Sequence, residues 1–304
     1  MLGNNKRTSE FERNEVLEQV LEQAKNIIFE DTNGYYKKQQ DPLIVYIVGC
    51  PRSGTTLLHQ VLCNTGGFAY PSNIASRFYT NTYLGGIITR LLTDKEFDFK
   101  KETLIEDSID YYSDIGKTKG PISPNAFWYF WREYLEFSDN IIDLDKSDVK
   151  GFITGLHNMS MAFDYKPVVL KGAIANFSLN ELKKITRNFF FVYSKRNFKD
   201  NAESIMNARK RQYGNEKIWW SFPLKDMKSI QKLNPSEQVE CQVMQINNEV
   251  ESFLERISSD RKVTIAHEEF CMYPLESIEK ITEKIRLLTG KEVGVYNGPI
   301  KFKK

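Results

Sequence analysis

The segment from Gly49 to Thr56 combines glycines, hydroxyl side chains and one cation in a pattern suited to holding a phosphate group. It reads Gly-Cys-Pro-Arg-Ser-Gly-Thr-Thr and follows a run rich in β-branched residues, Ile44 to Val48. An apolar helical pattern begins directly after it. In the order strand, glycine loop, helix, backbone N–H groups and the N-terminus of the helix surround an anion. The segment therefore predicts a phosphate-binding loop.

One position of this loop differs from the loop of nucleoside triphosphatases. The spacing matches Gly-x4-Gly-Lys-Ser/Thr, but Thr55 stands where the lysine belongs, and Arg52 is the only cation of the loop. That lysine serves the β- and γ-phosphates beside Mg²⁺. Its absence argues against triphosphate hydrolysis and favours a different phosphate-like group.

A second strand followed by a helix, with polar residues after the strand, lies downstream. Phe189 to Tyr193 predicts a buried strand, Arg196 follows it, and Ser204 comes eight residues later in the next predicted helix. Arginine offers a forked pair of donors, and the serine hydroxyl would lie about two helical turns along. Because parallel strands place their carboxyl ends at one edge of a sheet, Arg196 and the glycine loop are expected to lie at the same edge.

Together the two elements resemble the sulfotransferases that use 3′-phosphoadenosine 5′-phosphosulfate (PAPS). Their phosphosulfate loop is similar to Pro51, Arg52, Ser53, Gly54, Thr55 and Thr56, and their 3′-phosphate pair to Arg196 and Ser204. Further segments that resemble bacterial members are 219–221 and 266–274, although His267 replaces a tyrosine. The resemblance spans roughly residues 43 to 290. It implies PAPS as the donor, adenosine 3′,5′-bisphosphate (PAP) as the product, and no metal.

The resemblance also implies catalytic roles. Arg52 and the N–H groups from Ser53 to Thr56 would stabilise charge on the departing phosphate oxygen. Lys171, at the end of a predicted strand, would approach the transferring group, although an ordinary solvated lysine is the alternative.

The general base, which removes the proton of the acceptor, is not assigned by the sequence. The family's lysine-x-histidine is missing, since Ala173 stands where the histidine belongs, and no acid follows the loop at 70–73. Bacterial relatives carry an acid where this chain has Ala126, which is either natural or a replacement. Glu133, seven residues further on, and His157 are the remaining candidates, with packing roles as the alternative.

The arrangement of predicted elements indicates an α/β fold in a single domain, residues 1–304. Strands are expected at 44–48, 167–171, 189–193 and 263–266, and helices at 8–30, 55–64, 150–163, 178–187 and 275–288. This alternation predicts a three-layer, P-loop-type parallel sheet flanked by helices. Residues 68–145 show no such alternation of strands and helices and are rich in aromatic residues. This segment resembles the helical acceptor-side insertion of sulfotransferases.

The composition narrows the classes of function. The chain has 304 residues with a net charge of +2, which gives no global attraction for nucleic acid. Its four cysteines are scattered, so neither a zinc site nor a disulfide framework is indicated. No apolar run approaches the roughly 20 residues of a transmembrane segment, and the polar N-terminus is unlike a secretory signal. The expected location is cytoplasmic.

These observations predict a sulfotransferase that moves a sulfuryl group from PAPS to a hydroxyl acceptor. A carbohydrate acceptor, in the form of a glycan or a small molecule, is implied by the family alone. One alternative is a P-loop nucleotide kinase, against which Thr55 argues. The other is a catalytically impaired nucleotide-binding protein, which Ala126 and the missing histidine leave open.

Overall fold

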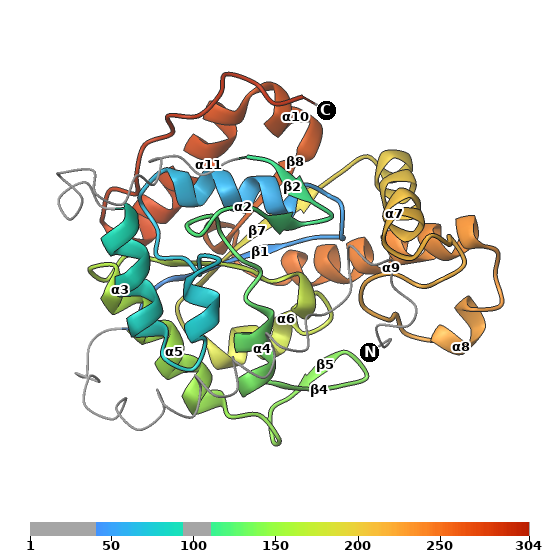
Figure 1. Cartoon of the computed structure of the whole chain (residues 1–304), viewed down its shortest axis with the longest axis horizontal. Helices are drawn as coiled ribbons and strands as arrows, with labels where there is room; N and C mark the ends of the chain where they lie inside the picture. Colours follow the sequence, from blue (N-terminus) through green and yellow to red (C-terminus); the bar gives the residue numbers. More distant parts are fainter. Residues whose placement is uncertain (1–40, 94–110, 304) are drawn as a thin grey trace.

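Four parallel strands form the centre of the protein (Figure 1), in a computed structural model that describes residues 41–93 and 111–303. The order across the sheet is β6 (Val168–Lys171), β1 (Ile44–Val48), β7 (Phe189–Lys195) and β8 (Lys262–Ala266). Every neighbouring pair is parallel. The predicted parallel sheet is confirmed. The predicted helix at 8–30 lies outside the described residues.

Helices cover both faces of this sheet. Figure 1 shows α2 (Thr55–Asn64), α10 (His267–Met272) and α11 (Pro274–Thr289) above it, and α4 (Trp128–Tyr134), α5 (Val149–Ala162), α6 (Leu179–Ile185) and α9 (Pro235–Glu255) below it. All five residues of β1 are buried, as expected for a strand covered on both faces. The three-layer architecture is therefore confirmed. In the described part of the chain, each helix is too short or too polar to cross a membrane.

Most predicted elements form within a few residues of their expected bounds. A serine just before a helix often caps it by its side chain, but Ser178, which precedes α6, does not. Its Oγ instead accepts from the Ile142 N–H and donates to the Asn140 carbonyl oxygen. The sequence pattern also does not predict α9. A capping box formed by Asn234 and Glu237 stabilises the first turn of this helix.

The described parts of 68–145 contain two α-helices, a short 3-10 helix at Ala75–Phe78 and two small hairpins, with 94–110 outside the described residues. The α-helices are α3 (Thr82–Thr93) and α4; the hairpins, which the sequence does not predict, are β2–β3 (Ser113–Asp114, Lys117–Thr118) and β4–β5 (Glu136–Ser138, Ile141–Asp143). In α4, Phe130 and Trp131 are fully buried. They pack on Phe152 of α5, at 5.0 and 5.3 Å between ring centroids. These two aromatics belong to the core.

Two further α-helices follow β7 in the chain. They are α7 (Phe198–Tyr213), which leads directly out of β7, and the short α8 (Met227–Ile230). Since α7 begins at the carboxyl end of β7 and packs on α9, it is fixed beside the edge of the sheet where β1 also ends. This edge receives both predicted phosphate-binding elements.

The contact between α4 and α5 allows a test of the core. A Cβ atom on Gly155 of α5 would lie 2.4 Å from Cε2 of Phe130. Gly155→Ala should therefore lower the free energy of unfolding by about 1–3 kcal/mol, the usual cost of overpacking, measured by urea denaturation. Asn158→Ala, on a less buried face of the same helix, is the control. A more stable Gly155→Ala protein would contradict this packing, because helix propensity alone favours alanine.

Candidate active site

The loop between β1 and α2 takes a backbone path that its glycines make possible. Gly49 and Gly54 have φ of 140° and 93°, and Arg52 also has a positive φ of 70°. A Cβ atom on Gly49 would lie 2.4 Å from the Ser194 carbonyl oxygen, and one on Gly54 would lie 2.2 Å from Nδ1 of His267. Side chains at these positions would push the loop away from β7 and α10.

Neighbouring elements hold this loop by hydrogen bonds to its backbone. Asn176, just after β6, accepts from the Gly49 N–H at 3.1 Å and donates to the Gly49 carbonyl oxygen at 2.8 Å. Asn201 of α7 donates to the Pro51 carbonyl oxygen at 2.8 Å, and Ser194 of β7 to that of Ser53 at 2.7 Å. All three side chains are buried. The loop is therefore fixed before any ligand arrives.

The structure brings the two predicted phosphate-binding elements together. Nε of Arg52 donates to Oγ of Ser204 at 3.1 Å, and Nη1 of Arg196 donates to the Arg52 carbonyl oxygen at 3.0 Å. Burial, and then the nearby charge of Arg196, lower the pKa of Arg52. Two guanidinium groups held this closely in a partly buried site would be stabilised by an anion between them.

Several buried polar atoms of the described residues have no hydrogen-bond partner, and two of them belong to the predicted phosphate-binding elements. These two are Oγ of Ser53 and Nε of Arg196. Because buried polar groups are almost always paired, such atoms indicate the position of a missing partner. The N–H of Ser53, by contrast, bonds the Cys50 carbonyl oxygen at 3.0 Å, so the expectation that it faces the ligand is not supported. The first N–H groups of α2 after Gly54 remain suited to that role.

Lys171 ends β6 on the other side of the loop. Its Nζ donates to Oγ1 of Thr56 at 2.6 Å. Partial burial, together with the charge of Arg52, lowers the pKa of Lys171 to about 8. His59 of α2 is buried and close to this ammonium group, and these two causes lower its pKa to about 3. His59 is thus neutral at ordinary pH, and the cations of the site are Lys171, Arg52 and Arg196.

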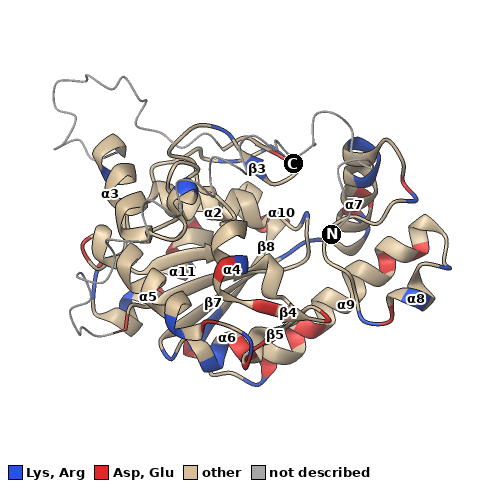
Figure 2. Cartoon of the chain, turned by 60° about the horizontal axis from the view of Figure 1, so that its bottom comes forward, with Lys and Arg blue, Asp and Glu red and all other residues tan. Residues whose placement is uncertain are grey.

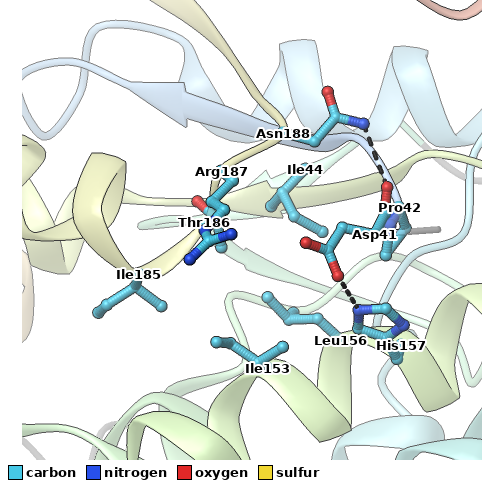
Figure 3. A pocket seen from close by; sticks show the side chains of 10 residues that line it. All are labelled: Asp41, Pro42, Ile44, Ile153, Leu156, His157, Ile185, Thr186, Arg187 and Asn188. Atoms are coloured by element: carbon cyan, nitrogen blue, oxygen red, sulfur yellow. Dashed lines mark hydrogen bonds and ion pairs between the residues drawn. The ribbon is translucent and has the colours of Figure 1, made fainter. Parts of the chain in front are cut away.

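The structure places His157 at the opposite edge of the sheet. Figure 3 shows it directed at Asp41, with 2.9 Å between Nε2 and Oδ1. Asp41 and Asn188, which line the same cavity of about 230 Å³, precede β1 and β7 and mark the amino ends of the strands. A second cavity, of about 540 Å³, lies at the carboxyl ends, beside Arg196. His157 is therefore remote from the glycine loop.

The other candidates for the base lie near α4. Glu133 directly precedes Tyr134 in α4. Burial of Tyr134, together with the carboxylates of Glu133 and Asp148, raises the pKa of Tyr134 to about 12. This places Glu133 where α4 meets the start of α5. Ala126 follows Asn125, whose side chain donates to Oδ1 of Asn73 at 2.8 Å. In the described residues, His, Cys, Asp and Glu do not gather in any group of three that could hold a metal ion.

The sequence does not single out the three side chains that hold the loop backbone, which are Asn176, Ser194 and Asn201. Asn and Ser are common in loops and helix ends, so their types alone carry no signal. The only available hint was their position at the ends of predicted strands or in the helix after Arg196, the edge at which ligands bind in parallel sheets.

The clamp of Asn176 on Gly49 can be tested by stability. Asn176→Ala leaves a buried N–H and a buried carbonyl oxygen without partners, which should lower the free energy of unfolding by about 2–4 kcal/mol. Urea denaturation measures the change, and Asn248→Ala, on an exposed position of α9, is the control. A loss no larger than that of the control would show that the two hydrogen bonds do not stabilise the loop.

Three solved sulfotransferase structures are similar to this chain. Sulfotransferase STF9 from Mycobacterium avium is 11% identical, with 90% of this chain and 73% of that chain covered and a TM-score of 0.51. Sulfotransferase STF1 from Mycobacterium tuberculosis H37Rv is 13% identical, with 91% of this chain and 76% of that chain covered and a TM-score of 0.45. The sulfotransferase domain from the curacin biosynthetic pathway is 14% identical, with coverage of 82% and 75% and a TM-score of 0.47. The likeness to STF9 is one of fold.

The family comparison is more specific. A search of curated proteins gave no significant match. A profile of the sulfotransferase family, however, matches residues 42–288, a stretch that begins just before β1 and ends in α11. It includes the glycine loop, Lys171, Arg196 and Ser204. Because this match extends over most of the chain, the protein belongs to the sulfotransferase family.

Proposed function

We propose that this protein transfers a sulfuryl group from PAPS to a hydroxyl acceptor and releases PAP. The observation that carries the proposal is the pair of unpartnered atoms, Ser53 Oγ and Arg196 Nε, beside two guanidinium groups at the carboxyl ends of adjacent strands. Such a site fits a ligand with two separate anionic groups better than one with a single phosphate chain. The family supplies the identity of the donor.

Each phosphate of the donor has its own set of side chains in this proposal. The 5′-phosphosulfate lies at the N-terminus of α2, beside Arg52 and the hydroxyls of Thr55 and Thr56. Lys171, which contacts Thr56, faces the transferring group and stabilises the charge that develops on the bridging oxygen. Arg196 and Ser204 hold the 3′-phosphate. Pro51 and Gly54 shape the loop.

The acceptor that we propose is a carbohydrate hydroxyl. Partly buried aromatic side chains suited to stacking on sugar rings lie near the end of α7, where Nε1 of Trp220 donates to Oε1 of Gln212 at 2.8 Å. A single-domain, cytoplasmic enzyme is part of the same proposal. Its chemistry uses positioning and charge stabilisation by the side chains named above.

The proposal is tested first by calorimetric titration with PAP, run beside Mg²⁺–ATP. We expect saturable PAP binding that chelators do not change, and weaker binding of Mg²⁺–ATP, because Thr55 replaces the lysine of the triphosphate loop. A preference for Mg²⁺–ATP would favour a nucleotide kinase instead. PAP binding without any sulfuryl transfer across a set of acceptors would favour a catalytically impaired nucleotide-binding protein.

The 3′-phosphate assignment predicts a selective loss of affinity. Arg196→Ala should weaken PAP by ~1.5–3 kcal/mol, the value of a charged hydrogen-bond partner, and barely change adenosine 5′-phosphate. Calorimetry measures both ligands. Arg187→Ala, at the opposite edge of the sheet, is the matched control. Because Arg196 also bonds the loop backbone, equal losses for the two ligands would mean that it serves the loop and not the 3′-phosphate.

The lowered pKa of Lys171 predicts how PAP binding depends on pH. Below about pH 8 the ammonium group is charged and contributes to anion binding; as pH rises through 8 the charge is lost, so the affinity should fall. The slope should approach about tenfold per pH unit, the limit for one proton. Lys171→Met should bind PAP more weakly and show no fall between pH 7 and 9. An unchanged slope in Lys171→Met would assign the titration to another group.

A further inference from the structure

The β2–β3 hairpin lies over the end of the site where the sulfuryl group would be transferred. Its turn contains Gly116, at a φ of 82°. A Cβ atom on Gly116 would lie 3.2 Å from Nζ of Lys171 and 3.4 Å from Oγ1 of Thr56. The turn therefore touches the two side chains proposed to face the transferring group.

The same hairpin carries a carboxylate into the cationic site. Arg211 of α7 donates from Nη2 to Oδ2 of Asp114 at 3.0 Å, and its Nη1 lies 2.9 Å from Oδ1. The side chain of Asp114 is 15% exposed. It also interacts electrostatically with Arg52, whose pKa it raises against the effect of burial. Asp114 thus lies between the glycine loop and the end of α7.

Helix α7 connects this carboxylate to the proposed 3′-phosphate site. Arg211 follows Ser204 by seven residues, so both lie on one face of the helix. One end of this face contacts Arg52 and the other contacts Asp114. Figure 2 shows basic segments along α7. In the proposed function, the donor and the hairpin therefore lie against the same face of α7. Arg52 contacts this face at Ser204, and Asp114 contacts it seven residues further along, at Arg211.

The hairpin is anchored on sides other than α7. Gln60 of α2 donates to the Tyr112 carbonyl oxygen at 3.0 Å. Asn73 donates to Oγ1 of Thr118 at 3.0 Å, and the Thr118 hydroxyl donates to the Pro124 carbonyl oxygen at 2.8 Å. These bonds fix both strands of the hairpin, and a carboxylate held in this way keeps a defined position. Such fixed geometry is what a general base requires.

A second carboxylate near the arginines has a different task. Glu268 accepts from the Asn197 backbone N–H at 3.0 Å and lies beside Arg196, lining the cavity between β8 and α9. Its hydrogen bond therefore lies at the start of α7, where Asn197 is the N-cap residue. Asp114 is the carboxylate that shares a hairpin with the turn over Lys171.

We propose that Asp114 is the general base of the reaction and that Arg211 is its positioning residue. The inference rests on the proposed function. The acceptor hydroxyl gives its proton to Asp114, and its oxygen forms the new bond to sulfur. The bond between sulfur and the 5′-phosphate oxygen breaks, and that oxygen keeps the electron pair. A carboxylate has about four lone-pair positions, so Asp114 can accept this hydrogen bond while Arg211 holds it.

A binding measurement tests the location of Asp114 without an acceptor. The ¹³C signal of its carboxyl group, assigned by its loss in Asp114→Asn, is recorded at one pH with and without saturating PAP. The charged groups that face this carboxyl are Arg52 from the loop, Arg211 from α7 and Lys117 from the paired strand. The phosphates of PAP bring negative charge close to this carboxyl and to Arg52, so PAP binding should change the chemical shift of the signal. Bound PAP without this change overturns the assignment, whereas failure of PAP to bind overturns the proposed function instead.

A single-turnover measurement tests the role of Asp114 in proton transfer. Excess protein is mixed with PAPS, water takes the place of the acceptor, and PAP and sulfate are measured over time. Asp114→Asn should slow this step by about 10²–10⁴-fold while PAP binding and thermal stability are kept.

Arg211→Gln is the matched variant, because it breaks the same ion pair and leaves the carboxylate in place. It should lose less than about tenfold, since the base itself remains. Equal losses in Asp114→Asn and Arg211→Gln would mean that the pair only fastens the hairpin, and equal rates in wild type and Asp114→Asn would mean that Asp114 takes no proton. Either result overturns the proposal.

Discussion

The close contact between the glycine loop and β7 is the constraint on which the site depends. The loop must turn from β1 into α2 while its backbone lies against the Ser194 carbonyl oxygen, and only a residue without Cβ allows this at Gly49. Both polar backbone groups of Gly49 are then out of water and need partners, which Asn176 supplies. The direction of Arg52 and of the first turn of α2 follows from this one fixed residue.

The gathering of cations around this loop has an energetic cost that the fold must balance. Lys171, Arg52 and Arg196 share one edge of the sheet, and burial with mutual repulsion lowers the pKa of the first two. Asp114 offsets part of this repulsion, and the neutral state of His59 avoids adding to it. In the proposed function, the remaining excess of positive charge favours a ligand with several negative charges.

The sheet separates this chemistry from the rest of the molecule. Its carboxyl edge holds the loop, Lys171 and the start of α7, while the amino edge holds the Asp41–His157 pair and a small cavity. The aromatic residues of α4 fill the space under Tyr46, so that β1 is supported from below where its end must stay rigid. Helix α9, which also packs on this face through Phe253, completes that support.

The sequence by itself determined the four strands of the parallel sheet, the helices α2, α5, α6 and α11, the glycine loop and the Arg196–Ser204 spacing, because each is a pattern of neighbouring residues. The tertiary structure decided what surrounds them. The partners Asn176, Ser194 and Asn201 meet the loop across 127, 141 and 150 residues of chain, and no local period records such contacts. Asp114 lies in a short hairpin without a strong strand pattern, so only the packing of that hairpin against Lys171 and Arg211 reveals it. His157 shows the converse, since its residue type suggested chemistry and its place in the fold removed it from the site.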